Sequence, residues 1–267
     1  MATKNKTSPV KTANKKTAAV KNITAKDTAV KLTAAHFIAR LQALQSDEEL
    51  KKIQRYFKSG EGQYGEGDTF MGVKMGQLFA LAIAFNGMPI TEIEKLLQSN
   101  IHEVRAGAIS IMDKESRSKK ITPARLKAFY DLYMRRHDSI NNWDLVDLGC
   151  LYMTGSYLFD KPKQVLYKLA KSKNIWERRT AILSTCYFIR KGETADTFKI
   201  AELLLKDKED LIHKATGWML RFAGDKEPKK LSAFLDEHAV TMPRTLLRGA
   251  IEKLPAAKKG YYMGLKK

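Results

Sequence analysis

The chain has 267 residues, of which 48 are Lys or Arg and 29 are Asp or Glu, so its formal net charge is +19. A chain of this length buries enough surface to fold without disulfides, and an apolar fraction of 44% excludes a wholly disordered protein. The excess positive charge favours a polyanionic partner, nucleic acid first and an anionic membrane surface second.

The first 31 residues form a basic, low-complexity segment. They contain eight Lys and one Asp but no Arg or aromatic residue, so the segment carries +7 and the remainder +12. Lys, Thr and Ala offer nothing with which to form a core, so we predict disorder. We place this tail at residues 1–32 and a folded domain at residues 33–267. Two interpretations stay open: an arm that lies on phosphates, or a solubilising extension without a specific partner.

The remainder of the sequence is typical of successive helices. Apolar residues recur at helical spacing, as in Phe198, Ala201 and Leu205, and breakers containing Gly or Pro separate the helical runs. No alternation typical of strands, bounded by hairpin turns, is present. The predicted fold class is therefore all-α.

A weak repeat runs through these helices. Similar segments begin at Ile101, Ile140, Ile175 and Leu211, at intervals of 39, 35 and 36 residues. A two-helix unit of this length is typical of an α-solenoid, and the TPR consensus is missing. We therefore predict a superhelix of HEAT-like helix pairs, in which the second helix of each pair lines a concave face.

What the sequence lacks excludes several kinds of site. No apolar h-region follows the start and no apolar run reaches the ~18 residues of a membrane span. We therefore expect no secretory signal, no membrane-spanning helix and no membrane as a partner. Cys150 and Cys186 lie apart, without a CxxC pair or a Cys/His cluster, which argues against zinc. We expect no metal, and lone thiols suit a reducing bacterial cytoplasm.

Residues 141–147 read Asn-Asn-Trp-Asp-Leu-Val-Asp and resemble a helix start. The Asn residues are N-cap candidates, and Trp143 and Asp147, at i and i+4, share one face. Asp144 is explained as a favourable charge in the first turn. An aromatic ring beside a carboxylate can bind a cation. The alternative is a core Trp beside a structural ion pair, which residue chemistry alone favours.

Residues 174–182 contain adjacent arginines. Arg178 and Arg179 point about 100° apart on a helix, so only one of them can face a given surface squarely. One can grip a phosphate, while the other pairs with an acid or with a neighbouring helix. Trp176 is more simply a core residue.

Residues 213–221 combine basic and aromatic side chains. Lys214, Trp218 and Arg221 form a stripe that suits a phosphate backbone and a stacked base. Gly217 inside this helix costs up to ~1 kcal/mol relative to Ala, which predicts the close approach of another backbone or of a ligand.

Two more segments complete the set. Pro243 suits the first position of a helix, on which Arg244 and Arg248 share a basic face, either for phosphate contact or simply solvated. Residues 60–73 are rich in Gly but lack the Lys-Ser/Thr of a nucleotide loop and a preceding strand. We expect an ordered turn there.

Taken together, these segments resemble the DNA alkylation repair family, the HEAT-like-repeat alkylpurine DNA glycosylases of the AlkD type. The likeness extends over roughly residues 40–255, and it is the order of the pieces that makes it specific. The chain departs from the family pattern after Val73, where a Pro and then an Arg are missing. The segments that carry the likeness are residues 56–58, 62–73, 102–105, 142–147, 176–179, 213–221 and 242–248.

The resemblance implies site residues. Trp143 and Asp147 match the aromatic residue and catalytic acid of the family, and Arg179 matches a basic residue near the lesion. Trp218 matches a second tryptophan that faces the lesion, and Tyr64 an aromatic near the same place. The expected DNA-binding residues are Tyr64, Arg105, Arg178, Lys214, Arg221, Arg244 and Arg248.

The resemblance also implies a reaction. A monofunctional glycosylase of this kind hydrolyses the N-glycosidic bond of cationic alkylated purines, such as 3-methyladenine and 7-methylguanine, in double-stranded DNA. Asp147 would stabilise the oxocarbenium ion and orient water. Neither a metal nor an organic cofactor is needed, and we expect a monomer. Two rivals remain: a non-catalytic HEAT-like module that binds distorted or branched DNA, and a protein–protein scaffold.

Overall fold

The chain is helical throughout the part that the structure describes, as its periodicity predicts. The computed structural model describes residues 31–57, 60, 63 and 65–265. Among these residues the one strand-like contact is an isolated bridge between Thr69 and Ile101. The prediction of an all-α fold is confirmed. The tail and its boundary stay predictions, because residues 1–30 lie outside the described residues.

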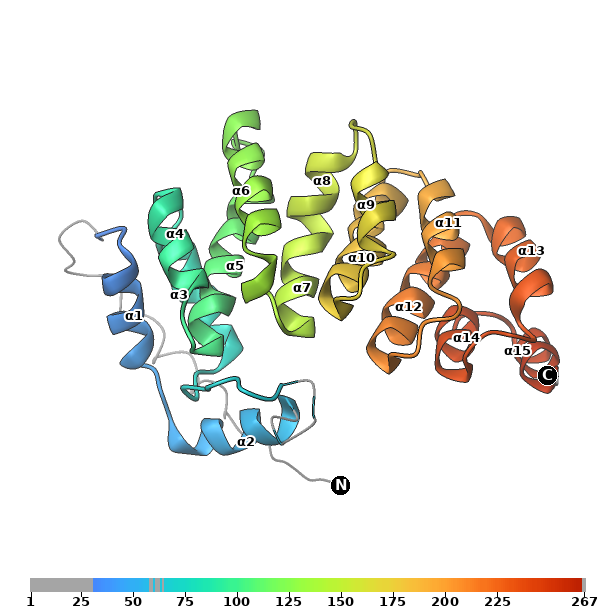
Figure 1. Cartoon of the computed structure of the whole chain (residues 1–267), viewed down its shortest axis with the longest axis horizontal. Coiled ribbons are helices and arrows are strands. Elements are labelled where there is room, and N and C mark those ends of the chain that lie inside the picture. The colour runs from blue at the N-terminus through green and yellow to red at the C-terminus, as the bar shows by residue number, and fades with distance from the viewer. Residues whose placement is uncertain (1–30, 58–59, 61–62, 64, 266–267) are drawn as a thin grey trace, which may run out of the picture. The chain divides into compact units, whose positions relative to one another are not determined.

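The residues from Leu32 onwards form one compact unit of helices (Figure 1). Its α-helices are α1 (Ala34–Gln42), α2 (Asp47–Phe57), α3 (Met75–Ala84), α4 (Ile90–Leu97), α5 (His102–Ser116), α6 (Pro123–Arg135), α7 (Trp143–Gly149), α8 (Gly155–Leu158), α9 (Gln164–Leu169), α10 (Ile175–Arg190), α11 (Ala195–Leu203), α12 (Asp210–Lys226), α13 (Pro228–His238), α14 (Arg244–Ile251) and α15 (Ala256–Gly264). A 3₁₀ turn, η2 (His137–Ser139), precedes α7, and a π-helical segment, η3 (Cys150–Thr154), follows it.

Side-chain caps account for several helix starts. Thr33 and Thr122 each accept a hydrogen bond from the amide three residues on, at 3.3 and 3.2 Å, and Pro123 occupies the first turn of α6. Asn174 accepts from the amide two residues on at 2.8 Å. These bonds satisfy amides that lack a partner within the helix. The residues next to these helix starts therefore determine where the helices begin.

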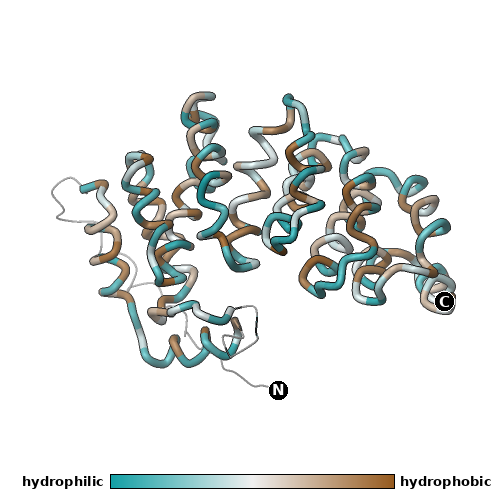
Figure 2. The backbone as a smooth tube through the Cα atoms, in the orientation of Figure 1, coloured by the Kyte–Doolittle hydropathy of each residue, from teal (hydrophilic) through white to brown (hydrophobic). Residues whose placement is uncertain are grey.

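The helices pack in two sets, each of which follows the order of the chain. One row consists of α3, α5, α7, α10, α12 and α14, in which each helix contacts the next. The helices α4, α9, α11 and α13 pack against this row, and α6 packs against η3. Figure 2 shows apolar and polar positions interleaved along the helices, as expected of helices that bury one face. This order of contacts is what a stack of helix pairs requires.

Within the row, α5, α7 and α10 are buried over more than half of their length. In α5 every residue from His102 to Asp113 is buried, including four that carry charged or titratable side chains. A buried polar group must find a partner inside the protein, because unpaired burial costs about 1–3 kcal/mol. In the first turn of α5, His102 is accordingly paired with Asp144 and Arg105 with Asp68.

Gly217 lets α12 and α14 approach closely. A Cβ built on Gly217 would lie 2.6 Å from the carbonyl oxygen of Leu246 and 3.1 Å from the Cα of Gly249. The predicted close approach of another backbone is confirmed, and that backbone belongs to α14.

We expect Gly217→Ala to destabilise the protein by about 1–3 kcal/mol, because backbone atoms of α14 cannot yield to the new methyl group. Gly76→Ala in α3 is the matched control, since no atom lies within 4 Å of the corresponding Cβ. The control should gain up to ~1 kcal/mol from helix propensity. Urea denaturation measures both values, and equal behaviour of the two variants would contradict the close contact.

Candidate active site

The two residues predicted to share one face lie on α7. As predicted, Asn142 caps this helix, accepting a hydrogen bond from the backbone amide of Trp143 at 2.8 Å. Shortly after Asp147 the helix widens into η3, and π-helical segments often occur at functional sites. Trp143 and Asp147 therefore lie on a helix with a fixed start and an irregular end.

The carboxylate of Asp147 is held by Arg179 of α10. Arg179 Nε and Nη2 donate to its two oxygens at 2.8 and 3.0 Å, and Nη1 donates to the backbone carbonyl of Leu211 at 2.6 Å. The side chain of Arg179 is 6% exposed and that of Asp147 is 20% exposed. Burial raises the pKa of Asp147 above its ordinary value, although the guanidinium acts in the opposite direction. The acid is thus anchored from inside and accessible at one side.

Trp143 packs against the end of α2. Its ring is stacked on Phe57, with centroids 5.7 Å apart, and meets Tyr56 edge to face at 5.8 Å. It also packs on the buried cluster of Ile53, Phe57 and Phe70 while remaining only partly buried. One part of the Trp143 ring thus packs on the core, and another part stays accessible at the surface.

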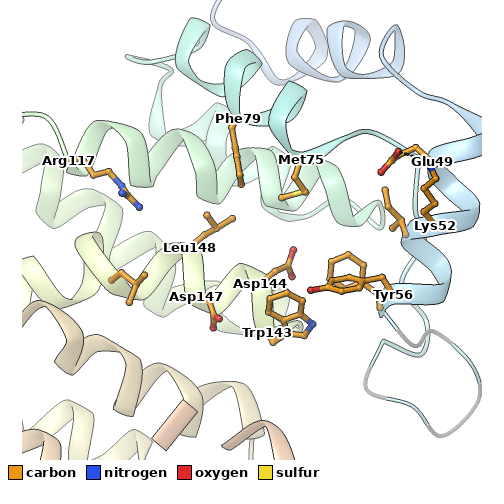
Figure 3. Close-up of a pocket in the computed structure, with 13 residues that line it drawn as sticks. Glu49, Lys52, Tyr56, Met75, Phe79, Arg117, Trp143, Asp144, Asp147 and Leu148 are labelled. Atoms are coloured by element: carbon orange, nitrogen blue, oxygen red, sulfur yellow. Dashed lines mark ion pairs between the residues drawn. The ribbon is translucent and has the colours of Figure 1, made fainter. Parts of the chain in front are cut away.

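A cavity of about 650 Å³ opens beside these residues (Figure 3). Trp143, Asp144 and Asp147 line it from α7, while Tyr56 lies at one end and Arg117 at the other. The volume lies within the range of ligand sites in proteins. Much of the remaining wall is apolar, formed by Ile53, Phe57, Met75, Phe79, Leu148 and Leu151.

A buried charged network lies behind Trp143. His102 Nε2 is 2.8 Å from Asp144 Oδ2, and His102 Nδ1 is 3.4 Å from Asp68 Oδ2. Asp68 also accepts hydrogen bonds from Arg105 Nη2 at 2.6 Å and from Asn142 Nδ2 at 3.0 Å. The network joins the start of α5 to the start of α7, so it fixes the position of Trp143.

The network is charged at neutral pH. Burial alone would lower the pKa of His102, but the carboxylates of Asp144 and Asp68 raise it to about 9. Burial would raise the pKa of Asp68, but hydrogen bonds from His102 and Asn142, together with the charge of Arg105, lower it to about 2. Sequence patterns assign no role to Asp68 or His102, and they explain Asp144 only as a first-turn charge.

Two of the expected phosphate contacts are engaged inside the protein. Arg105 and Arg178 are each the fourth residue of their helix, and each donates from Nη1 to the backbone carbonyl six residues earlier, at 2.8 and 3.0 Å. Arg105 also pairs with Asp68 and Arg178 with Asp207, both at 2.6 Å. His213, fourth in α12, contacts the carbonyl six residues earlier at 2.7 Å. Both arginines thus link the start of their helix to the preceding loop and to an aspartate, and their guanidinium groups are not free on the surface.

The stripe predicted on α12 is partly accessible. Trp218 is half-buried and meets Phe222 edge to face at 5.6 Å, but it is not among the residues that line the cavity. Lys214 is exposed and pairs with Asp210 at 2.6 Å. Arg221 pairs with Glu252 of the loop after α14.

Arg244 and Arg248 are both exposed on α14. Arg244 Nη2 donates to the backbone carbonyl of Met263 at 2.6 Å. We predicted that Pro243 is the first residue of this helix. The helix begins at Arg244, so Pro243 is its N-cap, one position earlier than predicted. Tyr64, the remaining expected site residue, lies outside the described residues.

The described part of the glycine-rich segment is a structural turn. The buried carboxylate of Glu103 accepts hydrogen bonds from the amides of Met71 and Gly72 at 2.9 and 2.8 Å. These amides are used internally and are not available to a phosphate. The departure from the family pattern after Val73 does not prevent a helix, because α3 begins at Met75.

Neither a metal cluster nor a membrane span occurs in the described part of the chain. No group of three or more His, Cys, Asp or Glu residues there would suit a metal ion. None of the helices formed by these residues is both long and apolar enough to cross a bilayer. Cys150 and Cys186 are buried free thiols.

Fold and site together define an all-α protein with an anchored acid and an aromatic residue beside a cavity. The sequence matches the family model of the DNA alkylation repair enzymes over residues 37–254. The chain therefore belongs to the DNA alkylation repair enzyme family. Membership supports an enzymatic role in DNA repair, with DNA as the partner.

A solved structure has a similar fold. It is described as a predicted DNA alkylation repair enzyme from Enterococcus faecalis, with a TM-score of 0.61 and 20% sequence identity. The match covers 79% of this chain and 97% of that chain. At this identity the likeness concerns the fold alone. Curated proteins give no match to the sequence.

We expect the stability contributed by His102 to decline at alkaline pH. Its folded-state pKa of about 9 exceeds the ordinary value of 6.5, so the contribution is complete below pH 6.5 and is lost as the pH rises through 9. The free energy of unfolding from urea titrations should fall by up to roughly 3 kcal/mol over this interval. His102→Gln should lack this decline and His213→Gln should retain it; an undiminished decline in His102→Gln would count against the network.

Proposed function

We propose that this protein is a monofunctional DNA glycosylase that hydrolyses the N-glycosidic bond of cationic alkylated purines, such as 3-methyladenine and 7-methylguanine, in double-stranded DNA. One observation carries the proposal: the accessible, anchored carboxylate of Asp147 lies beside Trp143 on the wall of a cavity. Membership of the alkylation repair family supplies the class of substrate.

The chemistry of the lesion explains what the site must supply. A purine alkylated at N3 or N7 carries a positive charge, so it already leaves as a neutral base without a strong general acid. The bond from C1′ to the purine nitrogen breaks, and its electron pair goes to the base. The sugar is left as an oxocarbenium ion, which water then attacks at C1′ with loss of a proton.

Asp147 is suited to the developing charge on the sugar. A fixed carboxylate in a poorly solvated site stabilises a cation that forms beside it, and the same oxygens can orient water or accept its proton. Arg179 holds both oxygens by hydrogen bonds, so the carboxylate need not reorganise during the reaction. We assign Arg179 to positioning this acid and to favouring its ionised form.

Trp143 is suited to a cationic base. The face of an indole ring attracts a cation by about 0.5–2 kcal/mol more than a neutral group of the same shape. Stacking on Phe57 and the buried network at the start of α7 hold the ring in place. Trp218 is proposed as a second lesion-facing ring, on the family resemblance.

The DNA backbone is proposed to contact exposed cations on α12 and α14. Lys214, Arg244 and Arg248 are exposed, and phosphate contacts of this kind position a protein on a duplex without reading its sequence. Arg221 stays a weaker candidate because its side chain is only 18% exposed and already pairs with Glu252. The basic tail is proposed to add attraction at low salt, and the chain to act as a monomer.

We expect Asp147→Asn to release free alkylpurine from methylated duplex DNA at least about a hundredfold more slowly than the wild type, since stabilisation of the transition state by a fixed charge is worth this much or more. DNA affinity should change little. Single-turnover release of 3-methyladenine and 7-methylguanine measures the effect, and Asp131→Asn, in an exposed ion pair on α6, is the matched control. Binding without release by the wild type would instead support the non-catalytic module.

We also expect the rate of release to fall on acidification. Burial raises the pKa of Asp147, so its carboxylate is protonated at a higher pH than that of an exposed Asp. Single-turnover rates, corrected for release without enzyme, should decline as the pH falls through this pKa. In Asp147→Asn the small residual rate should not follow this decline. A wild-type rate independent of pH down to the ordinary range of Asp would contradict the role of the carboxylate.

A further inference from the structure

Two arginines meet around one tyrosine on the far side of the cavity from Tyr56. The guanidinium carbon of Arg117, at the end of α5, lies 4.0 Å from the ring centroid of Tyr152, and that of Arg190, at the end of α10, lies 4.9 Å from it. Because both distances run to one centroid, the two Cζ atoms lie at most 8.9 Å apart, the sum of 4.0 and 4.9 Å.

The positive charge of this pair is only partly compensated. Arg117 uses its Nε alone to pair with both oxygens of the buried Asp113, at 2.9 Å. Arg190 is exposed, and no described carboxylate forms an ion pair with it. Like charges this close repel each other, so their arrangement favours an anion that contacts both. The Tyr152 ring attracts each cation and holds the two in place.

The geometry around the pair resembles a binding site. A depression of about 530 Å³ is lined by Arg117, Tyr152 and Arg190, with Ser156 and Lys191 beside them. These side chains offer N–H and O–H donors from three separate parts of the chain. Guanidinium donors bind phosphate oxygens at about 2.8 Å, so two guanidinium groups whose Cζ atoms lie no more than 8.9 Å apart can both reach one phosphate group.

The depression adjoins the proposed active site. Arg117 also lines the cavity beside Asp147, and Figure 3 shows it at the end of that cavity opposite Tyr56. A strand whose lesion lies at Asp147 therefore has a cationic group within reach along the same wall. Neither arginine occurs in the segments that carry the family resemblance.

We propose that Arg117, Tyr152 and Arg190 form a phosphodiester clamp that holds a backbone phosphate of the DNA strand and fixes its path across the cavity. The partner is inferred from charge complementarity between the paired guanidiniums and a phosphodiester. The place of the clamp on the damaged strand rests on the proposed function, whereas its affinity for DNA does not.

The salt dependence of DNA binding tests the clamp. We would measure the affinity of the full-length protein for an undamaged duplex by fluorescence anisotropy over a range of salt concentrations. Losing one phosphate contact lowers the slope of log K against log salt by about 0.9. Arg190→Gln should show this loss and bind several-fold more weakly at low salt, and Tyr152→Leu should do the same, because it frees both arginines from the ring.

Arg135→Gln is the matched control, since this exposed arginine of α6 already pairs with Glu94. It should leave slope and affinity unchanged. If Arg190→Gln and Tyr152→Leu also leave both unchanged, the clamp is wrong, even if the wild type releases alkylpurines. If the wild type releases none while its salt slope depends on Arg190, the proposed glycosylase function is wrong and the clamp stands.

Discussion

The ion pair between Asp147 and Arg179 is the interaction on which the site depends. Burial raises the pKa of Asp147 and so favours the neutral acid, which cannot stabilise a cationic sugar, whereas the guanidinium of Arg179 lowers this pKa and favours the carboxylate. Arg179 meets both oxygens and at the same time reaches the carbonyl of Leu211, so one side chain joins α7, α10 and α12. The same guanidinium therefore holds the charge at the site and links three helices of the row.

Three helices of the row, α5, α10 and α12, pair the polar groups at their starts in the same way. The fourth residue of α5, α10 and α12 reaches the carbonyl six residues earlier, and in α5 and α10 this residue is an arginine that also pairs with a distant aspartate. An unpaired carbonyl or carboxylate at these positions would cost about 1–3 kcal/mol. This repetition explains why Arg105 and Arg178 resemble DNA ligands in the sequence although their guanidinium groups are paired within the protein.

Features determined by residues close in the sequence were predictable. The cap at Asn142, the shared face of Trp143 and Asp147, and the need for a small residue at Gly217 follow from local spacing and from helix geometry. The pairing of Arg105 with Asp68 and of Arg178 with Asp207 spans 37 and 29 residues, so it depends on how the helices stack. The cavity was equally unpredictable, because its wall combines α2, α3 and α7 with a π-helical segment.

The pair formed by Asp147 and Arg179 carries no net charge when both groups are ionised, and this matters in a protein of net charge +19. In the free protein Arg179 balances Asp147, so the acid does not repel the phosphates on either side of a lesion. Because Arg179 is buried and bonded to a backbone carbonyl, the acid keeps its place when a cationic sugar forms, and the accessible part of the carboxylate can interact with the new charge. His102, which is also charged, lies buried behind Asp144 and cannot reach a base in the cavity. On the proposed mechanism, a neutral purine thus finds stabilisation for its sugar at Asp147 but no proton from His102, and the site favours bases that are already cationic.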